Sequence, residues 1–488
     1  MTPAERSFAE QLERTAGVEW RPAGEPNFVC TLRAQGREAF LRAKLPTPKH
    51  EDWRYTSLAA LAAQPFAPAP RARAWAGSTR ELPAAPRLVF VNGRLDPDAT
   101  DLTRLPAGVR MGSLGTALRE RPAAVQPHLG QVAAPGAHAF TALNAGLFED
   151  GAVVEIEDGV SCAPTLHLVF LDSGACVAAH PRNLILAGRH ARAAIVESYR
   201  GEGSYLVNAV TELSLGEGAH VEHDRLQEDA PHAFHVGVVQ VAQAARSSFT
   251  GQSIALGGEL ARVEARVLLG GEGATCDLHG LYVATGKQVL DHLVYVDHAS
   301  PRCVSREVFK GVLDGASRGV FAGRVHVREG ARKTDASQVN SNLLLSEDAT
   351  VDTKPQLEIL NDDVKCSHGG TVGQIREDQL FYLRSRGLSE ALARAMLTWA
   401  FASEMVRMVG PEEARARVQR AVTARLPHGA LLRHDSLLSE PALGGLWGSG
   451  ARSPQAEVER SSTGSDLGSP EPAAASTRNG EGAPTEVA

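Results

Sequence analysis

Short alternations of apolar and polar residues run through the middle of the chain, from about residue 150 to residue 375. Stretches such as Thr165–Phe170 and Ala265–Leu269 have the length of typical strands, and Gly, Asp or Ser residues separate them. Long helical periods do not interrupt this region. The pattern therefore predicts a mainly β core, built from many short strands that are joined by tight turns.

The predicted core also repeats itself. The sequence Gly-Glu-Gly-Ala at 216–219 recurs at 271–274, and Arg-Glu-Gly-Ala follows at 328–331, so the spacings are 55 and 57 residues. Related turns near Ala191 and Ala245 lie about 28 residues from Ala219 on either side. A unit of this size with small residues at its corners is typical of a β-solenoid, whose stacked coils share one core. A β-sandwich is the alternative that the pattern leaves open.

Helical periods precede this core. Residues 2–45 place apolar side chains at helical spacing. The following segment, Lys49–Thr56, mixes charged and aromatic residues. We interpret it as a docking segment, in which Trp53 and Tyr55 anchor the N-terminal helices to the core. Contact with a partner protein is a second interpretation of the same segment.

Helical periods also follow the core, beginning after Gly373. The stretch Glu377–Arg386 predicts a helix that ends at Gly387, and Ser389 is a suitable N-cap for a second helix at Glu390–Val409. The second helix has an apolar face wide enough to contact one further surface, and this face includes Met396, Trp399 and Ala400. The surface that it contacts is either its own domain or a partner protein.

These patterns divide the chain into five parts. They are an N-terminal helical region with a linker, a mixed region, the β-solenoid core, a C-terminal helical domain and a disordered tail, with the bounds 1–86, 87–149, 150–375, 376–440 and 441–488. Within the mixed region, Leu88–Val91 predicts a strand that enters an Asn-Gly turn, and Leu114–Arg119 predicts a short helix.

Composition and charge exclude several classes of function. The chain of 488 residues has a formal net charge of −7, and no stripe of Lys and Arg is interleaved with aromatic residues, so we expect no nucleic-acid binding. No apolar run approaches the roughly 20 residues that cross a bilayer, so we expect no membrane span. The N-terminus is polar, and the six cysteines form no Cys-x-x-Cys pair. We therefore expect a cytoplasmic protein in a reducing compartment.

The strongest chemical candidate is the stretch Cys366-Ser367-His368. Side chains alternate along a strand, so Cys366 and His368 would share one face, with Cα atoms about 6.5 to 7 Å apart. A thiolate and an imidazole make half of a soft-metal site, which normally has about four ligands. The remaining ligands would have to come from another strand or another chain. The alternative is a buried thiol beside a histidine that is hydrogen-bonded within the core.

Three other motifs are weaker candidates. The sequence around Ser317 matches a hydrolase nucleophile elbow, but a strand pattern follows where a helix is needed. Gly280–Lys287 resembles a phosphate-binding loop but has one residue too many, and Gln288 replaces the Ser or Thr that binds magnesium. Four histidines suggest zinc, although their spacing does not place them on one strand face; they are His220, His223, His232 and His235.

Longer motifs carry a resemblance to a known family. They are Phe309–Gly323, Asp335–Ser346, Thr353–Ile359, Asp362–Gly373 and Asp378–Gly387. Together they strongly resemble the SufB/SufD family of iron–sulfur cluster assembly proteins, and Pro46–Thr56 resembles the SufD branch of that family. The resemblance implies a right-handed parallel β-helix between N-terminal and C-terminal helical domains. It also implies a non-catalytic scaffold subunit of an ATP-driven assembly complex.

The resemblance further implies partners and a shared site. SufB would pair with the chain along the β-helix, and the SufC ATPase would dock on the C-terminal helices. His368, with Cys366 beside it, would lie near a SufB cysteine and share iron or a transient iron–sulfur cluster with it. A flavin at the level of the complex and a homodimer of the isolated chain stay open. The alternatives are a purely structural partner that touches no metal and a stand-alone β-solenoid enzyme that uses His220, His223 or Ser317.

Overall fold

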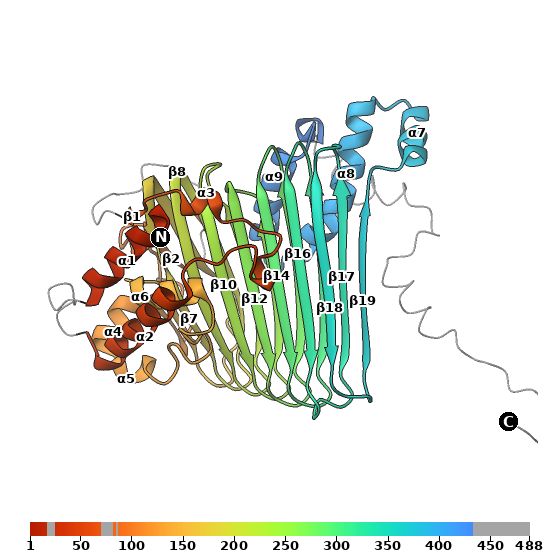
Figure 1. Cartoon of the computed structure of the whole chain (residues 1–488). Helices are drawn as coiled ribbons and strands as arrows, with labels where there is room; N and C mark the ends of the chain where they lie inside the picture. The colour runs from red at the N-terminus through yellow and green to blue at the C-terminus, as the bar shows by residue number, and fades with distance from the viewer. Residues whose placement is uncertain (17–24, 70–81, 84–85, 433–488) are drawn as a thin grey trace, which may run out of the picture. The chain divides into compact units, whose positions relative to one another are not determined.

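The computed structural model describes residues 1–16, 25–69, 82–83 and 86–432. The predicted tail at 441–488 lies outside these residues, as does most of the predicted linker between residues 70 and 85. The described chain is a parallel β-solenoid with helices at both of its ends (Figure 1). The predicted mainly β-solenoid fold is therefore confirmed, and the β-sandwich alternative is wrong, because successive coils pair in parallel.

Two walls of parallel strands form the solenoid. The odd wall consists of β9 (His220–Glu228), β11 (Ser248–Ala255), β13 (Thr275–Ala284), β15 (Val304–Leu313), β17 (Asp335–Leu344) and β19 (Lys365–Gly373). The even wall consists of β10 (Phe234–Gln243), β12 (Leu260–Leu269), β14 (Val289–His298), β16 (Arg318–Val327) and β18 (Thr350–Ile359). The long strand β8 (Arg192–Leu215) starts both walls, because its first half pairs with β9 and its second half with β10.

Earlier strands lead into these walls. They are β1 (Ala67–Pro68), β2 (Arg87–Val91), β3 (Arg94–Leu95), β4 (Val109–Ser113), β5 (Ala152–Ile156), β6 (Leu166–Ala179) and β7 (Arg182–Ala187). The predicted strand and Asn-Gly turn are confirmed, because β2 and β3 form a hairpin in which Asn92 and Gly93 have φ angles of 50° and 75°. Positive φ at both central residues is what a two-residue hairpin requires.

The register of the strands explains the sequence repeat. Leu260 pairs with Val289 and Val289 pairs with Arg318, so one coil advances by 29 residues at this point. The recurring Gly-Glu-Gly-Ala sequences form corners, where Gly218 and Gly273 have positive φ angles of 66° and 69°. These left-handed positions favour glycine because it has no Cβ atom. The alanine that ends each corner sequence is fully buried, so the small residue is selected by packing.

The N-terminal helices pack on the even wall and on β4, β5 and β7, which lead into it. They are α1 (Pro3–Ala16), α2 (Asn27–Ala43), the 3-10 turn η2 (Glu51–Trp53), α3 (Ala59–Ala62), α4 (Leu114–Glu120), α5 (Pro122–Val125) and α6 (Ala139–Leu147). Phe8 of α1 stacks on Phe66, and Phe66 meets Phe234 of β10 edge to face. The predicted N-terminal helices and the short helix at Leu114 are therefore confirmed.

The segment around η2 docks on the even wall as predicted for Trp53. The guanidinium of Arg262 on β12 lies 4.0 Å from the centre of the Trp53 ring. Thr56 donates a hydrogen bond to Asp291 of β14, and Lys354 of β18 forms an ion pair with Glu51. This short segment therefore contacts three strands of the even wall, β12, β14 and β18. The second predicted anchor, Tyr55, is only half-buried.

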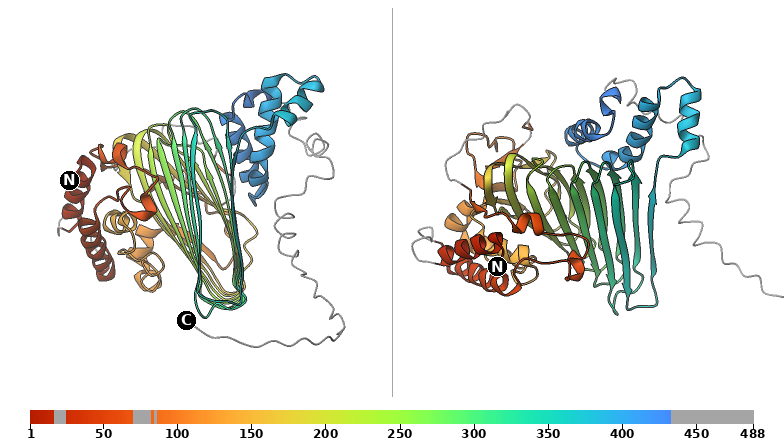
Figure 2. Two further views of the ribbon diagram at one scale, coloured as in Figure 1. Left: turned by 45° about the vertical axis from the view of Figure 1, so that its right-hand side comes forward. Right: turned by 45° about the horizontal axis from the view of Figure 1, so that its top comes forward.

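The C-terminal helices are α7 (Glu377–Ser385), α8 (Glu390–Arg407), α9 (Glu412–Arg425) and the 3-10 turn η4 (Gly429–Leu432). The predicted cap is confirmed, because the Ser389 hydroxyl accepts a hydrogen bond from the Leu392 amide. Gln252 of β11 and Lys310 of β15 hold α8 on the odd wall through Met405 O at 2.7 Å and Glu404 at 2.6 Å. The two helical groups thus flank opposite walls (Figure 2). No helix in the described ranges has the length and apolar character of a membrane span.

Candidate functional site

Cys366 and His368 lie on β19, the last strand of the odd wall. In the register with β17, Cys366 pairs with Ala336 and His368 pairs with Gln338. Ala336 and Gln338 are buried inside the solenoid, so Cys366 and His368 point to the interior side of the last coil. Within the described ranges, no further strand pairs with β19 beyond β17. The pair therefore stands on one face at the open end of the coil stack.

The two side chains have different environments. Cys366 is half-buried and packs against the small apolar cluster at this end, which contains Val325, Val327 and Leu357. Burial raises the pKa of the Cys366 thiol and therefore disfavours the thiolate, which is the form that binds a metal. The His368 imidazole is exposed and has no hydrogen-bond partner among the described residues. It is therefore not the core histidine of the alternative interpretation.

The described residues supply too few ligands for a closed metal site. Among the residues that the structure describes, no group of three His, Cys, Asp or Glu side chains could hold a metal ion. Cys366 and His368 could contribute two ligands of the kind that iron and zinc accept. A complete site would need donors from outside the described chain.

Two polar residues lie directly behind His368 inside the solenoid. Gln338 of β17 donates a hydrogen bond through Nε2 to Glu307 of β15, and both side chains are fully buried. Burial raises the pKa of Glu307 to about 8. The hydrogen bond from Gln338 opposes this shift but is the smaller effect. In the sequence, the alternation of Ser305, Glu307 and Phe309 along β15 was the only signal that Glu307 points inward.

The four histidines of the zinc hypothesis are not brought together. His223 forms an ion pair with Glu197 at 2.8 Å, and His235 bonds Asp229 at 2.7 Å. Burial opposes ionisation of Glu197, but the hydrogen bond and charge of His223, with the charge of Arg225, lower its pKa to about 2. Both histidines are therefore hydrogen-bonded to carboxyl groups in the interior, as buried polar side chains commonly are.

The remaining pair of that set, His220 and His232, lies at more exposed positions. The nucleophile-elbow hypothesis fails as well, because Ser317 is buried and its hydroxyl donates to Ala284 O at 3.2 Å. Strand β16 follows Ser317 directly. Gly280–Lys287 runs from β13 into a turn before β14, so no helix is present to bind phosphate at its N-terminus.

The apolar face of α8 is turned inward. Met396 and Trp399 are 6% and 4% exposed, and Ala400 is half-buried. Contact of a partner with Met396 or Trp399 would require these side chains to be uncovered first. The surface that is available without rearrangement belongs to α7, where Phe381 is 73% exposed. A shallow groove beside it is lined by Phe381, Arg384, Leu388 and Glu390.

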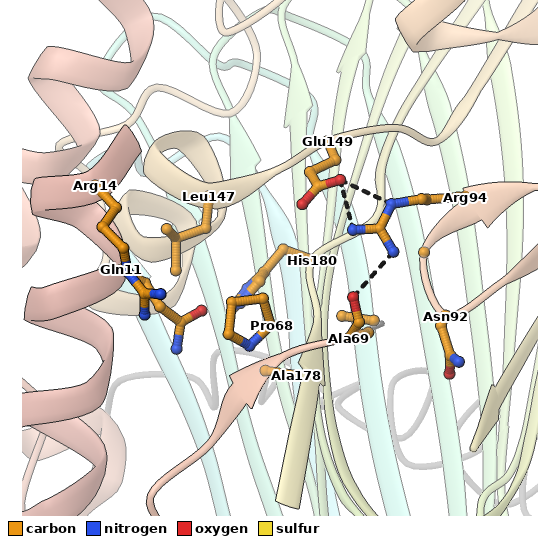
Figure 3. Close-up of a pocket in the computed structure, with 12 residues that line it drawn as sticks. Gln11, Arg14, Pro68, Ala69, Asn92, Arg94, Leu147, Glu149, Ala178 and His180 are labelled. Atoms are coloured by element: carbon orange, nitrogen blue, oxygen red, sulfur yellow. Dashed lines mark hydrogen bonds and ion pairs between the residues drawn. The ribbon is translucent and has the colours of Figure 1, made fainter. Parts of the chain in front are cut away.

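A small cavity lies between α1, β1, β3 and β6 (Figure 3). Its volume is about 100 Å³, below the about 300 to 1,000 Å³ that is typical of small-molecule sites. Glu149 on its wall is already paired with Arg94 at 2.7 Å, and Arg94 also donates to Ala69 O at 3.0 Å. Burial lowers the pKa of His180 to about 3, so this lining residue is neutral. Neither Glu149 nor His180 is therefore a free charged group at this cavity.

Comparisons with known proteins match most of the chain. The family described as "SUF system FeS cluster assembly, SufBD core domain" matches residues 169–401, and "SufBD protein N-terminal region" matches residues 22–168. The iron–sulfur cluster assembly protein SufD of Escherichia coli is 32% identical over 81% of this chain and 93% of its own length. A SufBD family protein of Synechocystis is 31% identical over 83% of this chain and 92% of its own. The chloroplastic protein ABCI7 of Arabidopsis thaliana is 27% identical over 87% of this chain and 92% of its own.

Proposed function

The chain belongs to the SufBD family of iron–sulfur cluster assembly proteins, and we infer that it is a SufD-type subunit of a SufB–SufC–SufD complex. Its role is that of a scaffold without catalytic residues of its own. We place this complex in the cytoplasm. In the purely structural alternative, the chain only stabilises SufB and positions SufC. Replacement of His368 would then leave the iron and sulfide content of the complex unchanged.

The proposed cargo site is shared between this chain and SufB. The observation that carries it is the exposed imidazole of His368, which stands beside the Cys366 thiol on β19, a terminal strand whose outer edge has no partner among the described residues. The free edge of such a strand presents unused backbone donors and acceptors, which favour pairing with another chain. Docking of SufB at this end would cover His368 and bring further ligands to it. Iron or a transient iron–sulfur cluster is then the bound substrate of the assembly reaction.

The proposed SufC surface is the exposed side of the C-terminal helices. Phe381 and Tyr382 are 73% and 44% exposed on α7, and the adjoining groove mixes apolar and charged side chains. Aromatic side chains at such a surface are typical anchors of protein contacts. Movement of α8 during the ATPase cycle would be needed before Met396 and Trp399 could take part. A flavin in the complex and a homodimer of the isolated chain are compatible with this proposal.

The test is anaerobic co-purification of the chain with SufB and SufC, followed by iron and sulfide analysis. The variant His368→Ala should leave the complex assembled and lower the iron and sulfide content. The matched control is Ser367→Ala, which lies on the same strand but points to the opposite side. Equal iron and sulfide content in the wild type, His368→Ala and Ser367→Ala would refute the shared site and support the structural role. Loss of assembly in His368→Ala alone would place the residue in the interface rather than in the cargo site.

A further inference from the structure

We propose that Gln338 is a positioning residue for His368. In the assembled complex, the carboxamide oxygen of Gln338 accepts a hydrogen bond from one imidazole nitrogen of His368. The lone pair of the other nitrogen is then directed toward the interface, where it is available to a metal. This inference rests on the proposed function, because it assigns a role to a residue that serves the same cargo site.

The register places the two side chains next to each other. Gln338 and His368 are paired positions on adjacent parallel strands, and both point to the interior side of the odd wall. Neighbouring strands lie about 4.8 Å apart, so side chains at paired positions are within reach of each other. The Nε2 atom of Gln338 is already used, because it donates to Glu307. The Oε1 atom is buried and has no hydrogen-bond partner within the described part of the chain.

A buried acceptor without a donor is unusual, because it loses its bond to water and gains nothing in return. A donor that reaches Gln338 Oε1 when the complex assembles would explain why this buried acceptor is present. The other polar neighbour, Glu307, already accepts from Gln338 and therefore fixes which end of the amide faces outward. His368 is the neighbouring donor in register that has no partner of its own among the described residues.

Gly323 makes the room for this carboxamide. It lies on β16 of the even wall, and a Cβ atom at this position would be only 2.1 Å from Gln338 Nε2 and 2.6 Å from Oε1. The Gln338 amide therefore crosses the interior and rests against a backbone that carries no side chain. Any side chain at position 323 would displace the amide while leaving Gln338 in the sequence.

Histidine ligands of metals usually donate their second ring N–H to an acceptor nearby. This bond fixes the tautomer and the ring orientation, and its loss typically weakens metal binding about 10-fold to 100-fold. The arrangement of Glu307, Gln338 and His368 fits this pattern. It also explains why a polar pair, Glu307 and Gln338, lies on the neighbouring buried strands β15 and β17, where an apolar pair would fill the same space.

The test is a Co²⁺ titration of the complex with SufB and SufC under anaerobic conditions, followed by absorbance. Gln338→Met keeps the size of the side chain but removes the acceptor, and it should weaken Co²⁺ binding about 10-fold or more. Gln338→Glu keeps an acceptor oxygen and should stay within about 3-fold of the wild type. Gly323→Ala should resemble Gln338→Met, because it displaces the amide. Thermal unfolding and co-purification of each variant report its folding and assembly.

The outcomes separate this inference from the proposed function. Weaker binding in His368→Ala, together with wild-type binding in Gln338→Met, overturns the role of Gln338 and leaves the cargo site in place. Wild-type binding in His368→Ala overturns both. An equal loss in Gln338→Met and Gln338→Glu indicates a packing role and also overturns the inference. The expected pattern is loss in Gln338→Met and Gly323→Ala with rescue in Gln338→Glu.

Discussion

Replacement of Glu307 by Gln should make the chain more stable at alkaline pH. The Glu307 carboxyl is fully buried, and burial raises its pKa to about 8 from the ordinary value of 4.5. The folded state therefore holds a proton that the unfolded state releases in the range between these two values. Stability that is fully present below pH 4.5 is lost as the pH rises, and the loss is complete above pH 8.

The size of the effect follows from the shift in pKa. A difference of one pKa unit corresponds to about 1.4 kcal/mol, so this shift costs about 5 kcal/mol above pH 8 and about 3 kcal/mol at pH 7. Glutamine has the shape of the protonated acid and cannot ionise. Glu307→Gln should therefore match the wild type near pH 4.5, become progressively more stable than the wild type up to about pH 8 and keep that advantage at pH 9, while its carbonyl oxygen still accepts from Gln338.

Urea denaturation followed by circular dichroism at pH 5, 7 and 9 measures this difference. The matched control is Glu358→Gln, which replaces an exposed carboxylate on β18 and should show no such trend. Other buried groups titrate equally in both proteins, so they cancel in the comparison. A stability difference between wild type and Glu307→Gln that stays constant from pH 5 to pH 9 would refute the reasoning, because Glu307 would then be ionised in the folded state throughout.

Three further changes have defined outcomes. Glu212→Ala leaves the fully buried Arg182 without its partner at 2.6 Å and should destabilise the fold by about 3 to 5 kcal/mol in urea denaturation; a change below 1 kcal/mol would contradict it. Asp224→Asn should stabilise the chain progressively between pH 4 and pH 7, because burial raises the pKa of Asp224 to about 7 and its protonated form is favoured in the fold; unchanged melting temperatures at pH 7 would argue against it. Phe381→Asp should abolish co-purification of SufC while the melting temperature stays within about 2 °C, because the side chain is exposed; retained SufC would place the docking surface elsewhere.

Much of the fold can be predicted from the sequence because the residues that determine it act on their local backbone. Positive φ angles at two corners favour glycine, which occupies positions 218 and 273. The helix N-terminus needs a side-chain acceptor, which Ser389 provides. The placement of Cys366 and His368 on one strand face needed only the period of a strand. These features depend on neighbours within a few residues of the chain.

Other features depend on contacts that sequence patterns do not carry. The alternation along β15 places Glu307 on one face with Ser305 and Phe309, but it does not reveal that the carboxyl is fully buried inside the coil stack. The apolar face with Met396 and Trp399 was correctly seen as a contact surface, but an amphipathic pattern does not say whether the contact lies within the chain or beyond it. Gln338 was missed because its importance comes from residues 31 positions upstream and 30 positions downstream, Glu307 and His368.

The terminal position of β19 also has a consequence for folding. In a stack of coils, each coil is stabilised by the coils that adjoin it, so the last coil has support from one side only. Its backbone amides should exchange with solvent sooner than those of the inner coils, and a partner that completes the stack should slow this exchange. Ordering of the last coil and binding of the partner are then one coupled equilibrium. A cargo site built on such a strand would form only in the presence of the protein that shares it.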